Sequence, residues 1–219
     1  MIGSLILIPW PETVWTAAGR IAGRTPLPLT EVGQKRAREW AVRLSSGRLS
    51  PVYSGTETAS LETARVIADY CRARRKPMEA LAEVDSGLWD GLTVTELKRR
   101  YPKVFKRWYD DPSSVCPPEG EDVVDAATRL QGALERVGRR LAGRQVALVT
   151  GPVALGIVRC LLEDVALNRL RGMLPGEPVR YSVEVADGGI RGSVASEDGE
   201  SAAGSGIPIA SNGPDNGAR

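Results

Sequence analysis

Apolar residues occur along the chain in two patterns, as short continuous runs and as stripes with helical spacing. The runs at residues 4–8 and 145–150 predict strands buried on both faces, and residues 51–54 predict a further strand. Helical stripes follow at residues 30–44, about 58–75, 94–100, 123–141 and about 154–162. Strands that alternate with helices favour right-handed crossovers, so the pattern predicts an α/β three-layer α/β/α sandwich with a mainly parallel sheet.

The C-terminal part of the sequence changes character. Residues 179–185 and about 190–194 are separated by Ala186-Asp187-Gly188-Gly189, which predicts a closing β-hairpin. From residue 197 onward the chain consists mostly of Gly, Ser, Ala, Asn and Asp, and it cannot bury enough apolar surface to offset its ordering entropy. We therefore expect one domain over residues 1–196 and a disordered tail over residues 197–219.

Composition narrows the class of protein. The 219 residues include 29 Lys and Arg against 27 Asp and Glu, and a net charge of +2 is too small to favour a nucleic-acid or anionic membrane partner. Cys71, Cys116 and Cys160 are too far apart for a disulfide framework or a zinc site. The apolar run near the N-terminus is too short for a signal peptide or a membrane span. We expect a cytoplasmic protein without a metal or cofactor.

The sequence contains no histidine. This excludes every mechanism that needs an imidazole, including serine–histidine triads, histidine-ligated zinc and phosphohistidine intermediates. Ser54, Thr56 and Thr150 have no base beside them in the sequence, so we expect no replacement nucleophile among them.

Six segments, in order, carry a family resemblance. They are residues 5–37, Val52-Tyr53-Ser54 with Glu62-Thr63-Ala64, Leu81 to Thr93 (LAEVDSGLWDGLT), Trp108 through Glu121, and residues 146–150. Together these segments resemble the histidine phosphatase superfamily, the fold of the cofactor-dependent phosphoglycerate mutases. The resemblance spans residues 4–185 and implies a phosphoglycerate mutase-like sandwich.

The resemblance also implies a site, and most of its residues are replaced here. The family places Arg-His-Gly after its first strand, where this chain has Pro9, Trp10 and Pro11. Where the family has an asparagine, a second arginine and a second histidine, this chain has Thr16, Ala59 and Gly151. Pro152 comes directly after Gly151. Only Glu83 matches, at the position of the general acid.

The replaced positions favour a pseudophosphatase of this superfamily that acts as a regulatory or structural binding subunit. Its expected partner is a protein, either an active paralogue or a second copy of the chain, and neither nucleic acid nor membrane. Each lost charge-assisted hydrogen bond is worth roughly 1.5–3 kcal/mol, which predicts weak phosphate affinity. Two alternatives stay open: a phosphate-ester hydrolase in which Glu83 activates water, and a small-molecule sensor.

Three kinds of residue allow both a binding and a structural interpretation. Trp10 either stacks on a ligand or fills the space that an imidazole and a phosphate would occupy. Arg20 and Arg24 either attract an anion at the rim of a pocket or serve the fold. Glu83 is either a retained acid or an ordinary polar loop residue.

Overall fold

The computed structural model describes residues 2–141, 143–186 and 189–195, so the predicted tail over residues 197–219 lies outside the described residues. Within them one sheet has the strand order β3-β2-β4-β1-β5-β6. The strands are β1 (Ile2–Pro9), β2 (Leu49–Ser54), β3 (Arg75–Pro77), β4 (Gln145–Thr150), β5 (Val179–Ala186) and β6 (Gly189–Val194). The first four are mutually parallel, whereas β5 and β6 add an antiparallel hairpin beside β1. The predicted closing hairpin is therefore confirmed.

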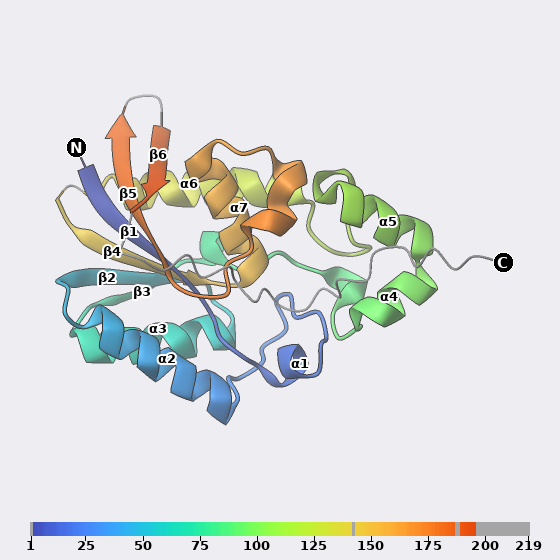
Figure 1. Ribbon diagram of the computed structural model, residues 1–219, viewed down its shortest axis with the longest axis horizontal. Coiled ribbons are helices and arrows are strands. Elements are labelled where there is room, and N and C mark those ends of the chain that lie inside the picture. Colours follow the sequence, from blue (N-terminus) through green and yellow to red (C-terminus); the bar gives the residue numbers. More distant parts are fainter. Residues whose placement is uncertain (1, 142, 187–188, 196–219) are drawn as a thin grey trace.

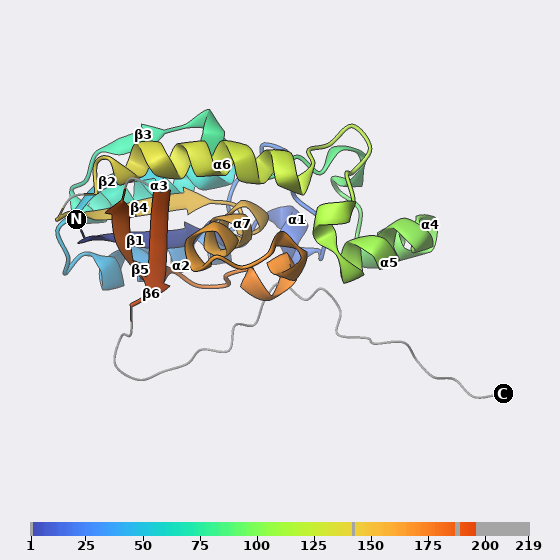
Figure 2. The same ribbon diagram turned by 90° about the horizontal axis from the view of Figure 1, so that it is seen from above.

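Helices cover both faces of this sheet. The α-helices are α1 (Val14–Ala17), α2 (Glu31–Leu44), α3 (Thr58–Cys71), α4 (Val94–Arg100), α5 (Pro102–Asp110), α6 (Val123–Gly138) and α7 (Pro152–Glu163). Figure 1 shows α2 and α3 on one face and α6 and α7 on the other, and Figure 2 shows the same layers from above. The predicted three-layer sandwich is confirmed. Within the described residues, no helix is both long enough and apolar enough to cross a bilayer.

Strand β1 shows why the central strands are continuous apolar runs. Leu5 and Leu7 pack in the cluster beneath α6 and α7, whereas Ile6 and Ile8 pack in the cluster beneath α2 and α3. Successive side chains of a strand point to opposite faces, so a strand between two helical layers must be apolar at every position.

Two elements differ from the sequence prediction. The helix predicted to reach residue 75 ends at Cys71, because Arg72 adopts a left-handed conformation with φ of 52°, and a short strand follows at residues 75–77. The sequence pattern predicts no helix between residues 100 and 123, but α5 begins at Pro102, whose missing N–H costs no hydrogen bond in a first helical turn.

Candidate active site

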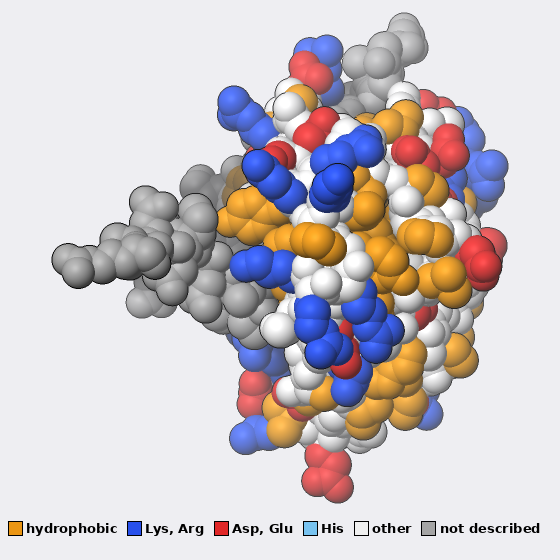
Figure 3. All heavy atoms as spheres, turned by 90° about the vertical axis from the view of Figure 1, so that its right-hand side faces the viewer, with side chains coloured by type: hydrophobic (Ala, Val, Ile, Leu, Met, Phe, Trp, Pro, Cys, Tyr) orange, Lys and Arg blue, Asp and Glu red, His pale blue; other side chains and the backbone are white. Residues whose placement is uncertain are grey.

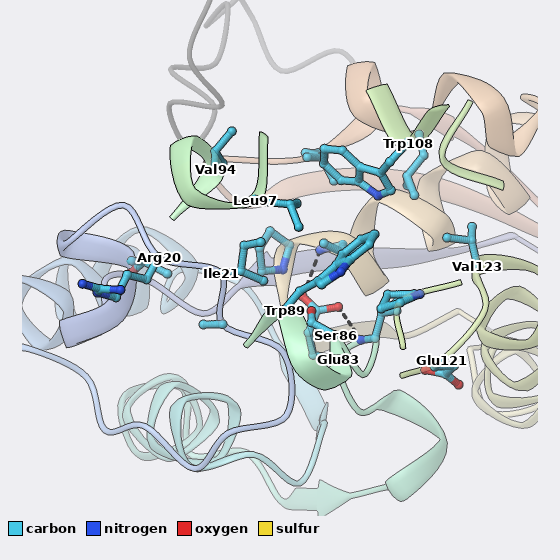
Figure 4. A pocket seen from close by; sticks show the side chains of 18 of the residues that line it. Arg20, Ile21, Glu83, Ser86, Trp89, Val94, Leu97, Trp108, Glu121 and Val123 are labelled. Carbon is cyan, nitrogen blue, oxygen red and sulfur yellow. Dashed lines mark hydrogen bonds between the residues drawn. The ribbon is translucent and has the colours of Figure 1, made fainter. Parts of the chain in front are cut away.

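A pocket lies where the parallel strands end. Pro9, Ser54 and Thr150 close β1, β2 and β4 at the same edge of the sheet, the edge at which open α/β sheets bind ligands. The pocket is lined mainly by apolar and aromatic side chains, among them Trp10, Ile21, Val84, Trp89, Leu97, Phe105, Trp108, Val115, Val123, Leu170 and Leu174. In Figure 4, Leu97 and Trp108 lie above Trp89, and Glu83 lies below it.

Glu83 is the buried acid of this pocket, with 1% of its surface exposed. Its Oε1 accepts the backbone N–H groups of Val84 at 2.6 Å and Ala154 at 2.7 Å, and its Oε2 accepts that of Val153 at 2.9 Å. Two of these donors belong to the first turn of α7, whose N-terminus favours a negative charge. The carboxyl group is therefore fixed in orientation, and it is no ordinary polar loop residue.

The environment of Glu83 places its titration near neutrality. Burial raises the pKa of its carboxyl group from 4.5 to about 7, the three backbone N–H groups lower it, and the charge of Glu57 raises it. Glu57 is itself buried and accepts the backbone N–H of Glu83. A pKa near 7 lets one carboxyl group both accept and donate a proton at physiological pH.

This raised pKa predicts a pH-dependent stability. An acid that binds its proton more tightly in the folded state contributes stability fully below its unfolded pKa, and that contribution is lost as the pH rises to the folded value. For Glu83 this window runs from pH 4.5 to about 7. Urea unfolding should show the wild-type protein losing about 3 kcal/mol relative to Glu83→Gln between about pH 4.5 and about pH 8. Parallel pH profiles for the two proteins would contradict the prediction.

Gly151 is the residue that makes room for this carboxyl group. A Cβ atom at position 151 would lie 2.0 Å from Oε2 of Glu83 and 2.5 Å from its Cδ. Such distances are far inside van der Waals contact, so a side chain at position 151 and the present orientation of Glu83 exclude each other. The present orientation of the Glu83 carboxyl group therefore requires glycine at position 151.

Two arginines hold the backbone at Glu83. Arg129 donates from Nη1 to the carbonyl groups of Ala80 and Ala82, and both Arg129 and Arg24 donate to the carbonyl of Glu83. Each arginine also pairs with Glu121, at 2.5 Å from Arg129 and 3.1 Å from Arg24. Arg24 thus serves the fold of the site. The sequence analysis missed Arg129, although Glu121 ends one of the segments that carried the resemblance.

Trp10 is 6% exposed and packs with Leu29, Ala37 and Ala59. The indole therefore fills space against Ala59, the position at which the resemblance implied an arginine. Trp10 also lines the pocket, and its indole N–H has no hydrogen-bond partner among the described residues. A buried donor without a partner is rare in folded proteins.

The other site positions predicted from the sequence place few free polar groups near Glu83. Pro9 is buried and pairs with Thr150 in the sheet. Thr16 belongs to the capping box of α1, although it also lines the pocket. Arg20 lines the pocket too, but it donates to the carbonyl of Gly91, pairs with Glu96, and points away from Glu83 in Figure 4.

The three hydroxyl groups considered as replacement nucleophiles do not line this pocket. Thr150 donates its hydroxyl to the carbonyl of Leu81 at 2.5 Å, and the exposed Thr56 donates to Glu79. Ser54 is buried, with 1% of its surface exposed.

The sequence matches the histidine phosphatase superfamily (branch 1) over residues 5–193. The chain belongs to this superfamily. Phosphoserine phosphatase 1 of Hydrogenobacter thermophilus is 32% identical over 165 residues, which cover 75% of this chain and 78% of that protein. A probable phosphoglycerate mutase GpmB of Yersinia pestis is 30% identical over 157 residues, or 72% of each chain.

Two solved structures share the fold. YhfR of Bacillus stearothermophilus superposes with a TM-score of 0.79 at 28% identity, over 87% of this chain and 95% of its own. A mycobacterial glucosyl-3-phosphoglycerate phosphatase has a TM-score of 0.79 at 20% identity, over 90% of this chain and all of its own.

The names of these superfamily relatives contradict the prediction of a pseudoenzyme that acts as a regulatory or structural binding subunit, because the relatives are named as enzymes. The prediction rested on the replaced positions Pro9, Trp10, Thr16, Ala59 and Gly151, which do not by themselves exclude a reaction that uses Glu83. Losing the imidazole removes the phosphohistidine route, whereas the buried acid and its pocket are retained.

Proposed function

We propose that this member of the histidine phosphatase superfamily hydrolyses phosphate esters of apolar alcohols or phenols, with Glu83 as the residue that moves the proton. The observation that carries the proposal is a fixed, buried carboxyl group with a pKa of about 7 in a mainly apolar pocket. A strongly perturbed acid in a concave site is a candidate catalytic group.

The proposed reaction needs no covalent intermediate. The ionised Glu83 accepts a proton from water while the water oxygen forms a bond to phosphorus and the bond from phosphorus to the ester oxygen breaks. The protonated Glu83 then gives that proton to the departing ester oxygen. The products are an alcohol and inorganic phosphate, and the carboxylate is regenerated for the next turnover.

The substrate's organic part is expected to supply most of the binding free energy. Pro9 and Ala59 occupy the positions where the resemblance implied arginines, and the guanidinium group of Arg20 points away from Glu83. The indole N–H of Trp10 offers one donor for a phosphoryl oxygen. Each buried CH₂ of a ligand contributes about 0.8 kcal/mol, so an aromatic body gains several kcal/mol from this pocket.

The experiment that tests this function measures phosphate release from 1-naphthyl phosphate and from glycerol phosphate by the repurified protein. We expect turnover above buffer for the naphthyl ester and much less for the glycerol ester, because only the former fills the apolar pocket. Phosphate release from neither ester, or equal release from both at equal concentration, would contradict the proposal.

Inhibition experiments test which part of the substrate supplies the binding free energy. We expect 1-naphthol to inhibit competitively, and inorganic phosphate or vanadate at about millimolar concentration to leave the rate unchanged, since a millimolar Kd already needs about 4 kcal/mol of binding free energy. Steady-state kinetics with each compound provide the measurement. Strong inhibition by vanadate together with none by 1-naphthol would show that the phosphoryl group, and not the organic part of the substrate, supplies most of the binding free energy.

A further inference from the structure

A dense cluster of positive charge lies at residues 98–107. Six of the ten residues from 98 to 107 are Lys or Arg, and no Asp or Glu lies between Leu97 and Tyr109. All six side chains are exposed: Lys98, Arg99, Arg100, Lys103, Lys106 and Arg107. Among the ion pairs of the described residues, none includes any of the six. We call these six residues the basic cap surface.

The basic cap surface lies at one end of the molecule. Helices α4 and α5 form the right-hand end in Figure 1, and Figure 3 looks onto that end, where basic side chains gather beside apolar ones. Tyr101 and Tyr109 are 41% and 39% exposed within the same segment. Arg171 stacks on the ring of Tyr109 at 3.6 Å and so ties the end of α5 to the body of the domain.

The inner sides of the same two helices are apolar. Leu97, Phe105 and Trp108 line the pocket that contains Glu83. They pack with Trp89 and Val115 in a cluster separate from the two main cores of the sandwich. One pair of helices thus presents apolar side chains to the pocket and cations to solvent.

We propose that the basic cap surface docks the protein on an anionic lipid bilayer. Clusters of four to eight Lys or Arg are sufficient for such electrostatic docking. Tyrosine rings favour the head-group level of a bilayer, and α4 and α5 lie at one end of the molecule in both ribbon views. The choice of a bilayer over a nucleic acid rests on the proposed function, because an apolar-bodied ester partitions into bilayers and would enter the pocket behind the same helices.

The whole-chain charge of +2 had predicted no membrane partner. That total averages over the chain and hides the local excess at residues 98–107. Docking of this kind is peripheral, so it needs no membrane-spanning helix.

Co-sedimentation of the full chain with vesicles tests the docking. One set of vesicles contains phosphatidylserine mixed with phosphatidylcholine, and the other contains phosphatidylcholine alone. We expect binding to the first set only, and we expect added salt to weaken it, because exposed charges are screened. Each basic residue near an anionic surface multiplies the affinity about fivefold, so the triple variant Arg99→Gln, Lys103→Gln, Lys106→Gln should bind about 100-fold more weakly.

A matched control removes the same charge elsewhere. Arg136, Arg139 and Arg140 are exposed at the C-terminal end of α6, at the other end of the molecule in Figure 2. Replacing all three by glutamine should leave vesicle binding within about twofold of wild type, because these arginines lie outside the docking surface.

Three results would overturn the proposal: equal losses in both triple variants, equal binding to both kinds of vesicle, or tighter binding to a duplex RNA than to the anionic vesicles. Sedimentation needs no turnover, so a negative result here is distinct from a failure of Glu83 as a catalytic residue.

Discussion

Replacing Glu83 by glutamine should lower kcat for 1-naphthyl phosphate by about 10²–10⁴-fold, the usual contribution of a positioned acid–base residue. Glutamine keeps the size of the side chain and one acceptor oxygen, but it neither accepts nor donates the proton of the reaction. Because the apolar wall of the pocket is untouched, KM should change by much less than kcat. Initial-rate kinetics on the purified variant measure both constants.

A matched control for this variant is Glu62→Gln. Glu62 is partly buried and accepts the backbone N–H of Leu29 at 2.9 Å, outside the pocket. We expect its kcat to remain within about twofold of wild type, since it contacts no part of the proposed reaction. An equal loss in the two variants would show that the effect of Glu83→Gln is structural.

Introducing alanine at Gly151 should abolish turnover and also destabilise the fold. The new methyl group would overlap Oε2 of Glu83, so the carboxyl group must leave the N–H groups of Val153 and Ala154. Each buried donor left without a partner costs about 1–3 kcal/mol, so the two donors predict a total loss of about 2–6 kcal/mol in the free energy of unfolding. Urea denaturation measures this loss.

Two further variants distinguish this overlap from the general effect of adding a methyl group. Gly132 lies in α6 with open space around its missing Cβ, so Gly132→Ala should be neutral or stabilise by up to about 1 kcal/mol. In a Glu83→Ala background, Gly151→Ala should cost much less than it does in the wild type, because the overlapping group is gone. Additive losses in that double-mutant cycle would contradict the proposed contact.

Much of the fold could be predicted because it depends on local patterns. The runs ending at Ile8 and Thr150 could be placed in a two-sided sheet from their unbroken hydrophobicity alone. Helix α5 could not, because proline both ends helices and begins them, and only the tertiary contacts of Phe105 and Trp108 decide between these roles. Without α5, one wall of the pocket could not be predicted, and the Lys and Arg residues of residues 98–107 could not be placed on one surface.

The site was predicted by position but not by environment. The sequence singled out Glu83 and Gly151 separately, yet their mutual exclusion depends on two segments that meet only in the folded chain. Likewise, the groups that modify the pKa of the buried Glu83 come from distant segments: the charge of Glu57 raises it, and the N–H groups of the first turn of α7 lower it. This missing environment is why the replaced positions favoured an inactive protein.

The pH dependence of kcat/KM for 1-naphthyl phosphate tests whether the ionised form of Glu83 drives hydrolysis in this pocket. A base must be unprotonated, so the wild-type rate should fall as the pH drops through the pKa of about 7 and level off above it. The Glu83→Gln variant should show a low residual rate without that inflection. A wild-type profile that is flat through neutrality, or an inflection that persists in Glu83→Gln, would contradict the account.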